Sequence, residues 1–384
     1  MKFEFATATR IVFGAGAAAG IGQEAAALGR RAFVLTGARP ERALPLLRRL
    51  ENHHVMHTEF PVVEEPTTDL VMDAVREAGM RGCDLVIGIG GGSVLDAGKA
   101  VAALLANGGD LIEYLEVIGE GRPLQRLSAP YIAVPTTAGT GAEVTRNAVL
   151  GSPSHKIKVS MRSPFMLPRL ALVDPEMTYS MPPGLTAATG LDALTQLLEA
   201  FVSRNANPVT DGICREGLRR AARSLVQAFE NGKDLQAREN MSLASLCGGL
   251  ALANAKLGAV HGIAGPFGGI FRAPHGAVCG RLLPFAAAVT IGALRERDPG
   301  SPAIERFREA ARMFTGDPAA AAEDGAAWLQ ALCDRLEIPA LSTYGFSEKH
   351  SADLIAKSMR SSSMAGHPVD LTAPELETIL NRAG

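Results

Sequence analysis

Four residues in the second half of the chain offer oxygen and nitrogen donors at spacings that suit a metal ion. Asp192 lies within an apolar segment and Gln196 follows four residues later, which places both side chains on one face of a helix. His261 and His275 lie in a glycine-rich segment that carries almost no charge. A carboxylate, an amide oxygen and two imidazoles form a ligand set for a divalent transition metal. The pattern therefore predicts a metal site built from these four residues.

The segment that would position the first two ligands, residues 182–204, has the pattern of a buried helix. Prolines at 182 and 183 suit the turn and the first helical position, where the missing N–H group has no helical partner to lose. Apolar side chains then recur at helical spacing, at Leu191, Leu194, Leu198 and Phe201. Buried helices rarely carry an acid, so Asp192 needs a partner or a function.

Each ligand candidate also has a structural alternative. Asp192 could pair within a helical domain, His261 could be a hydrogen-bonded core histidine, and His275 could be a turn residue. Successive separations of four, sixty-five and fourteen residues along the four candidates argue against coincidence. Cys279, one helical turn after His275, could be a soft metal ligand, although a buried thiol is the interpretation we favour.

A glycine-rich turn in the first half of the chain predicts a phosphate-binding loop. An apolar strand at 85–89 runs directly into Gly91, Gly92 and Ser93, and a helix follows at once. Glycines let a backbone approach a pyrophosphate, and a helix N-terminus offers N–H groups and a favourable dipole. Asp96 would lie in the first turn of that helix, where a carboxylate also suits the dipole. The alternative is a tight turn that simply requires glycine.

A second polar loop follows the strand at 131–135. Thr136, Thr137 and Thr140 place three hydroxyl groups beside glycines. Such a loop suits a position over a phosphate. A further glycine-rich turn, GAGAAAG at 14–20, lacks the G-x-G-x-x-G spacing and is predicted to be an ordinary strand-to-helix turn.

Taken together, these segments resemble the iron-dependent alcohol dehydrogenases. The resemblance rests on GLDALTQLLEAFVS at 190–203 and, about seventy residues later, on HGIAGPFGG and APHGAV. It implies that Asp192, His261 and His275 bind Fe²⁺ or Zn²⁺. Gln196 takes the place of a histidine ligand, and Gly265 takes the place of a further histidine. We therefore expect a metal centre that is weaker than is usual for the family.

The same resemblance implies NAD or NADP as the cofactor. The run GGGSVLDAGK at 90–99 matches the family's cofactor motif, and PTTAGTG at 135–141 matches its second loop. Lys158 falls on a lysine that contacts the cofactor in relatives, although a solvated lysine at a sheet edge is the alternative. Gly37 falls where the family has an aspartate.

Length and composition set the broad class of the protein. The chain has 384 residues, 47% of them apolar and 20% charged, which predicts two domains with real cores. A net charge of −2 gives no reason to expect nucleic-acid or anionic-membrane binding, and no apolar run reaches membrane-spanning length. Five scattered cysteines favour reduced thiols and a cytoplasmic enzyme. We expect a small alcohol or carbonyl substrate and a homodimer or higher homo-oligomer.

The order of elements predicts two domains with a boundary near residue 180. Strands and helices alternate over 1–180, which favours a Rossmann-like parallel sheet, with one strand or a hairpin expected over 1–15. Residues 181–384 are predicted to be all α-helical, with helices over 184–204, 208–230, 234–255, 277–296, 301–315, 319–335, 347–358 and after Thr372. Together with the resemblance, this indicates the dehydroquinate synthase-like fold of the iron-dependent alcohol dehydrogenases, with a dinucleotide-binding domain followed by a metal-binding and substrate domain.

The predicted reaction is hydride transfer between a nicotinamide cofactor and an alcohol, aldehyde or ketone, assisted by the metal. Two enzymatic alternatives share the scaffold. A maleylacetate-reductase-like enzyme would work without a metal, and a dehydroquinate-synthase-like lyase would use and regenerate bound NAD. A cofactor-binding protein without activity is a third alternative.

The first prediction concerns the choice of cofactor. An acid near the end of the second strand of such domains holds the adenosine 2′-hydroxyl and repels a 2′-phosphate. In this chain the position is Gly37, with Arg39 close behind. We expect NADP(H) to be accepted at least as well as NAD(H), measured as kcat/KM with each cofactor. A strong preference for NAD(H) would contradict this expectation.

Overall fold

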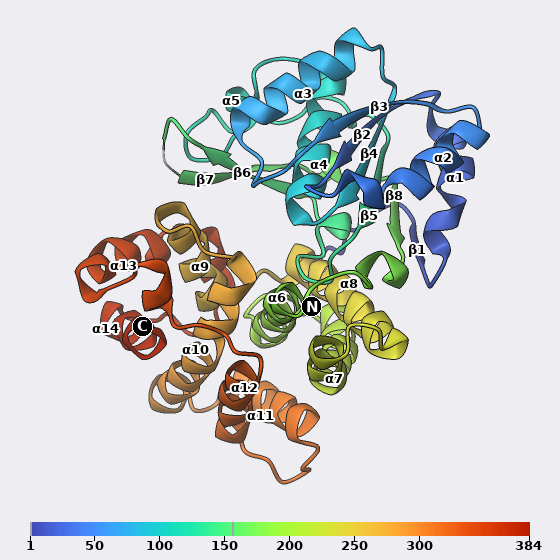
Figure 1. The fold of residues 1–384 in the computed structure, drawn as a ribbon. Helices are drawn as coiled ribbons and strands as arrows, with labels where there is room; N and C mark the ends of the chain where they lie inside the picture. The colour runs from blue at the N-terminus through green and yellow to red at the C-terminus, as the bar shows by residue number, and fades with distance from the viewer. Residues whose placement is uncertain (1, 156) are drawn as a thin grey trace. The chain divides into compact units, whose positions relative to one another are not determined.

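The computed structural model describes residues 2–155 and 157–384 and separates into two compact units (Figure 1). One unit contains Ala6–Thr137 and Gly141–Tyr179, and the other contains Ser180–Gly384. The second unit also includes the chain up to Phe5 and the short segment Ala138–Thr140. The sequence predicted a single boundary near residue 180 and did not predict that the three residues Ala138–Thr140 belong to the helical unit.

The first unit is built on a six-stranded sheet in the order β1-β8-β5-β4-β2-β3, and every pair in it is parallel. This confirms the predicted Rossmann-like sheet. A separate antiparallel hairpin pairs β6 with β7. The strands are β1 (Ile11–Phe13), β2 (Arg31–Thr36), β3 (Met56–Pro61), β4 (Leu85–Gly90), β5 (Tyr131–Pro135), β6 (Asn147–Ser152), β7 (Ile157–Arg162) and β8 (Leu170–Val173).

The expectation of one strand or a hairpin over 1–15 is confirmed only in part, because one strand forms but it is short. Only Ile11–Phe13 forms a strand, and it pairs with Ala171–Val173 of β8 at the edge of the sheet. The residues described before it are mostly exposed, and none of them joins a sheet. Alternation of polar and apolar residues is therefore not sufficient for a strand, and pairing with β8 begins only at Ile11.

Helices cover both faces of the sheet because alternate strand residues point to opposite sides. Phe33 and Leu35 of β2 pack with α3 (Thr68–Met80) and α4 (Gly92–Asn107), whereas Ala32 and Val34 pack with α1 (Ile21–Leu28) and α2 (Leu44–Asn52). Strands buried on both faces are expected to be almost continuously apolar, as these are. A further short helix, α5, spans Leu111–Tyr114.

The second unit is all α-helical, as predicted. Its central helix, α6 (Pro183–Val202), is buried along almost its whole length and packs against α7, α8 and α10. The others are α7 (Pro208–Glu230), α8 (Leu235–Ala255), α9 (Ala259–Ile270), α10 (His275–Arg297), α11 (Pro302–Thr315), α12 (Ala322–Arg335), α13 (Ser351–Met359) and α14 (Ala373–Ala383).

Helix α9 is absent from the sequence-based expectation, in which the glycine-rich segment that begins at His261 follows a predicted helix over 234–255, and the next predicted helix begins only at 277. Proline at 266 and four glycines lower the helix propensity of this stretch. Seven of its first nine residues are nevertheless buried within the protein. Tertiary packing therefore stabilises a helix that local propensity disfavours.

Helix α10 is long and apolar enough to cross a bilayer, but 72% of its most apolar stretch of 18 residues is buried within the protein. Two glycines let it lie close to α6. A Cβ atom added at Gly276 would lie 2.1 Å from the carbonyl oxygen of Ala188, and one added at Gly280 would lie 2.5 Å from Leu191 Cδ1. This close approach brings the start of α10 to the middle of α6.

The second prediction tests this approach. Gly276→Ala should lower the free energy of unfolding by about 1–3 kcal/mol, because the added methyl group meets backbone that cannot move aside. Gly292→Ala is the matched control on the same helix, since a Cβ atom there has open space. It should be neutral or stabilise by up to about 1 kcal/mol. Denaturant unfolding of both variants measures the difference, and equal stabilities would contradict the packing argument.

Candidate metal centre

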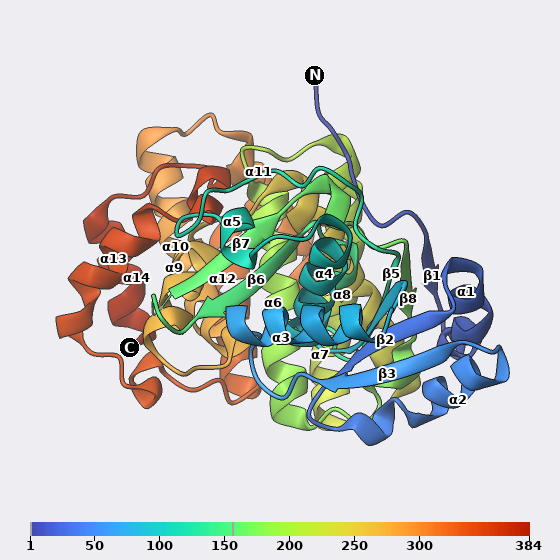
Figure 2. The same cartoon turned by 90° about the horizontal axis from the view of Figure 1, so that it is seen from above.

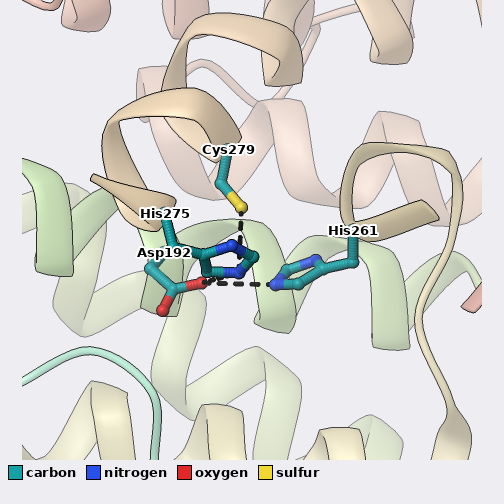
Figure 3. A group of neighbouring side chains, drawn as sticks. All are labelled: Asp192, His261, His275 and Cys279. Atoms are coloured by element: carbon teal, nitrogen blue, oxygen red, sulfur yellow. Dashed lines mark hydrogen bonds and ion pairs between the residues drawn. The ribbon is translucent and has the colours of Figure 1, made fainter. Parts of the chain in front are cut away.

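Three helices bring four potential ligands together (Figure 3). Asp192 comes from α6, His261 from α9, and both His275 and Cys279 from α10. One donor atom from each of the four lies within 4.8 Å of all the others. The Oδ1 atom of Asp192 is 3.2 Å from Nε2 of His261 and 3.9 Å from Nε2 of His275. A tetrahedral metal places nitrogen and oxygen ligands about 3.4 Å apart, so this donor set fits a divalent cation.

Glu199 fixes the orientation of His261. Its carboxylate lies two turns after Asp192 on α6 and accepts hydrogen bonds from the backbone N–H of Val260 at 2.7 Å and from Nδ1 of His261 at 2.7 Å. Since the carboxylate can only accept, Nδ1 carries the proton. The other nitrogen of the ring, Nε2, is thereby left to face Asp192.

This arrangement places two electron-pair donors against each other. With the proton on Nδ1, a neutral His261 has a lone pair on Nε2, which lies 3.2 Å from the carboxylate of Asp192. Both side chains are buried, with exposed fractions of 8% and 4%. The contact is stable only if a second proton or a cation lies between the two atoms. His275 is 36% exposed, so the site is open on that side.

The charges around the site strengthen this requirement. Burial lowers the pKa of His261, but Cys279, Asp192 and Glu199 outweigh that effect and hold it well above its usual value. For Cys279 the directions are reversed. Burial alone would raise the pKa of the thiol, but the two imidazoles outweigh burial, and the pKa of Cys279 is lowered. The pocket therefore concentrates negative charge and attracts positive charge.

Gln196 lies beside the site with its amide nitrogen directed towards acceptors. Nε2 lies 3.4 Å from the carbonyl oxygen of Gly139, and the amide interacts with the carboxylate of Asp192 and lowers its pKa. The oxygen, Oε1, is buried and has no hydrogen-bond partner among the described residues. It is directed towards α8, where a Cβ atom added at Gly248 would lie 3.0 Å away. Gln196 therefore holds Asp192 in place in this conformation.

The predicted phosphate loop lies at the carboxyl ends of adjacent strands. Gly91 precedes α4, which begins at Gly92, and a Cβ atom added at Gly91 would lie 3.4 Å from the side chain of Thr137. The N–H group of Thr136 donates to Gly90 at 2.9 Å. Gly37 follows the neighbouring strand β2, and a Cβ atom there would lie 3.7 Å from Val94. This edge of a parallel sheet is where open α/β folds bind ligands.

The other predicted cofactor residues have different surroundings. Asp96 accepts a hydrogen bond from the N–H of Val149 at 2.9 Å and pairs with the buried Lys99 at 2.9 Å, so it ties α4 to the β6–β7 hairpin. Lys158 on β7 pairs with Glu65 at 2.6 Å. Thr140 belongs to the helical unit, whereas Thr136 and Thr137 belong to the sheet unit.

Comparison with known proteins identifies the family. Residues 8–175 match the model for iron-containing alcohol dehydrogenases, and residues 186–384 match that for the C-terminal part of the Fe-containing alcohol dehydrogenase family. The chain belongs to the iron-containing alcohol dehydrogenase family. It is a metal-dependent oxidoreductase that transfers a hydride between a nicotinamide cofactor and an alcohol or carbonyl compound.

Individual relatives support the assignment. Alcohol dehydrogenase 4 of Schizosaccharomyces pombe is 35% identical over 87% of this chain and 76% of its own length. The 1,3-propanediol dehydrogenase of Klebsiella pneumoniae is 38% identical over 74% of each chain, and an NAD-dependent methanol dehydrogenase of Bacillus methanolicus is 37% identical over 62% of each. The superposition on the crystal structure of a 1,3-propanediol oxidoreductase covers all of this chain and all of that protein, with a TM-score of 0.93 and 31% identity.

The sequence analysis did not identify Glu199 as a residue of the metal site. A signal was present, because Glu199 lies seven residues after Asp192 and hence two helical turns along the same face of a buried helix. Two acids on one buried face indicate a shared cationic partner or histidines that join them. The structure shows that His261 contacts both carboxylates.

The third prediction concerns this contact. Glu199→Gln keeps the side-chain volume but removes the charge that holds the Nδ1 proton of His261. Metal affinity should fall about 10–100-fold, the usual cost of losing the carboxylate behind a histidine ligand. Competition with a chromophoric chelator measures it, and the exposed Glu305→Gln is the control. Unchanged affinity in Glu199→Gln would show that the contact does not support metal binding.

Proposed function

We propose that Asp192, His261 and His275 hold the divalent cation of this alcohol dehydrogenase and that the substrate binds on the open side, beside His275. The observation that carries the proposal is the 3.2 Å approach of His261 Nε2 to Asp192 Oδ1 while Glu199 holds Nδ1. A cation shared by both donor atoms removes the conflict. The family supports Fe²⁺ as the ion, with Zn²⁺ as the alternative.

A bound cation would polarise a carbonyl oxygen or lower the pKa of an alcohol. The residues of the chain then supply position and a dry environment. Glu199 keeps His261 in one tautomer, Gln196 holds the carboxylate of Asp192, and the burial of Asp192 and His261 excludes water from one side. During oxidation the alcohol would lose a hydride to the nicotinamide and a proton to solvent.

We further propose that Gly91, Gly92 and Ser93 bind the pyrophosphate of NAD or NADP, with Thr136 and Thr137 beside them. Support comes from the start of α4 at Gly92, which offers unpaired N–H groups to an anion. Thr140 and Lys158 are proposed contacts on the resemblance to relatives. Asp96 would act through its hold on α4, because its carboxylate is engaged by Val149 and Lys99.

Two features of the whole protein are also proposals. All five cysteines are free in the structure, which supports a reducing compartment and hence the cytoplasm. A homodimer or higher homo-oligomer is proposed on the resemblance to the family alone. Light scattering of the purified protein tests the assembly, and a monomeric mass would contradict it.

Two other readings of the reaction are separable by simple observations. A maleylacetate-reductase-like enzyme would keep full activity after metal removal. A dehydroquinate-synthase-like lyase would consume its substrate without net formation of NADH. The assembled donors Asp192, His261 and His275 favour the metal-dependent dehydrogenase.

The fourth prediction tests the proposed function. His261→Ala and His275→Ala should each lose the metal and at least about 100-fold in kcat/KM, because three ligands leave little to spare. Metal content is measured after purification without chelator, and turnover with a panel of alcohols and aldehydes and each nicotinamide cofactor. His53→Ala, an exposed histidine outside the site, is the control. Variants that keep both metal and turnover would overturn the metal site.

A further inference from the structure

We infer that the fourth protein ligand of the metal is the thiolate of Cys279, which supplies the donor that a histidine at the position of Gln196 usually supplies. This inference rests on the proposed metal site of Asp192, His261 and His275. It assigns a sulfur ligand to this chain, so that the donor set becomes one oxygen, two nitrogens and one sulfur.

The geometry of Cys279 carries the inference. Its Sγ atom lies 3.5 Å from Nε2 of His275, and it interacts with the ring of His261 as well. Metal–nitrogen bonds of about 2.0–2.1 Å and metal–sulfur bonds of about 2.3 Å place tetrahedral nitrogen and sulfur ligands about 3.6 Å apart. The observed separation matches this value. All four donor atoms also satisfy the common limit of 4.8 Å.

The position of Cys279 on its helix explains why the two ligands of α10 act together. His275 is the first residue of α10 and Cys279 is one turn later, so both side chains project from the same face towards α6 (Figure 3). Cys279 itself is completely buried. No movement of the backbone is needed to bring the sulfur to a cation held by the other three residues.

The orientation of Gln196 supports the same conclusion. Its amide nitrogen is engaged by Asp192 and by the carbonyl oxygen of Gly139, so its oxygen is directed away from the donor group and towards Gly248. Turning the amide would place its oxygen against two other oxygens, which is unfavourable. Gln196 therefore keeps a role as a donor to Asp192, and the sulfur fills the ligand position.

A sulfur ligand changes which metal the site prefers. A thiolate is a softer donor than an imidazole, and it favours Zn²⁺ and Co²⁺ over Fe²⁺ more strongly than a third nitrogen or a second oxygen does. On binding, the thiol gives its proton to solvent and its sulfur lone pair to the cation. We therefore expect Zn²⁺ to compete better against Fe²⁺ in the native chain than in a variant without the thiol.

The fifth prediction uses Co²⁺ as the probe, because thiolate ligation to Co²⁺ produces an intense near-ultraviolet charge-transfer band that oxygen and nitrogen ligands do not give. The full-length protein is stripped with a chelator and titrated with Co²⁺. The native chain should develop the band at one equivalent. Cys279→Ser should still bind Co²⁺ but lose the band, and its affinity should fall at least about 10-fold, the lower end of the cost of losing a supporting contact.

Two control variants make the result specific. Cys333→Ser removes another buried thiol, one that donates to the carbonyl oxygen of Gly280 on the same helix, and it should keep the band. Gln196→Ala should also keep the band, since the amide is not a ligand. A native chain that binds Co²⁺ without the band, or a Cys279→Ser variant that retains it, would overturn the sulfur ligand and leave the metal site intact. A native chain that binds no Co²⁺ would overturn the metal site itself.

Discussion

A carboxylate in the middle of a largely buried helix is the constraint around which the helical unit is arranged. Asp192 has a side-chain exposure of 4%, and an isolated charge in such a position is costly. The structure meets that cost with side chains from two other helices, and it adds a second carboxylate, Glu199, behind His261. The excess of negative charge is balanced only when positive charge enters the pocket. We propose that a divalent cation supplies it.

Close packing of the helices makes this arrangement precise. Gly276 lets α10 approach α6 to a distance that no side chain would allow, and His275, directly before it, is thereby brought to Asp192. The N-terminal turn of α9 is fixed independently, because Glu199 binds the N–H group of Val260 as well as the ring of His261. The site therefore depends on backbone contacts as much as on its donor atoms.

The sequence predicted the parallel sheet, the helical second half and three members of the donor group, because spacing and apolar periodicity are properties of single elements. It did not predict α9, since a proline and several glycines hide a helix that only tertiary packing stabilises. The position of Cys279 beside both imidazoles also depends on how three helices meet. The sequence also predicted Gln196 as a ligand. That its amide nitrogen faces Asp192 depends on the assembled structure and could not be predicted from spacing.

The donors of the site come from three separate helices, and α9 and α10 both begin more than fifty residues after α6 ends. An ion that binds them all acts as a cross-link in the folded state and has no equivalent in the unfolded chain. At a free concentration 100 times its dissociation constant, such a ligand adds about 2.7 kcal/mol to the free energy of unfolding. The amount of folded enzyme in a cell would thus depend on the metal available to it. Metal limitation would increase proteolysis of the protein, independently of its effect on catalysis.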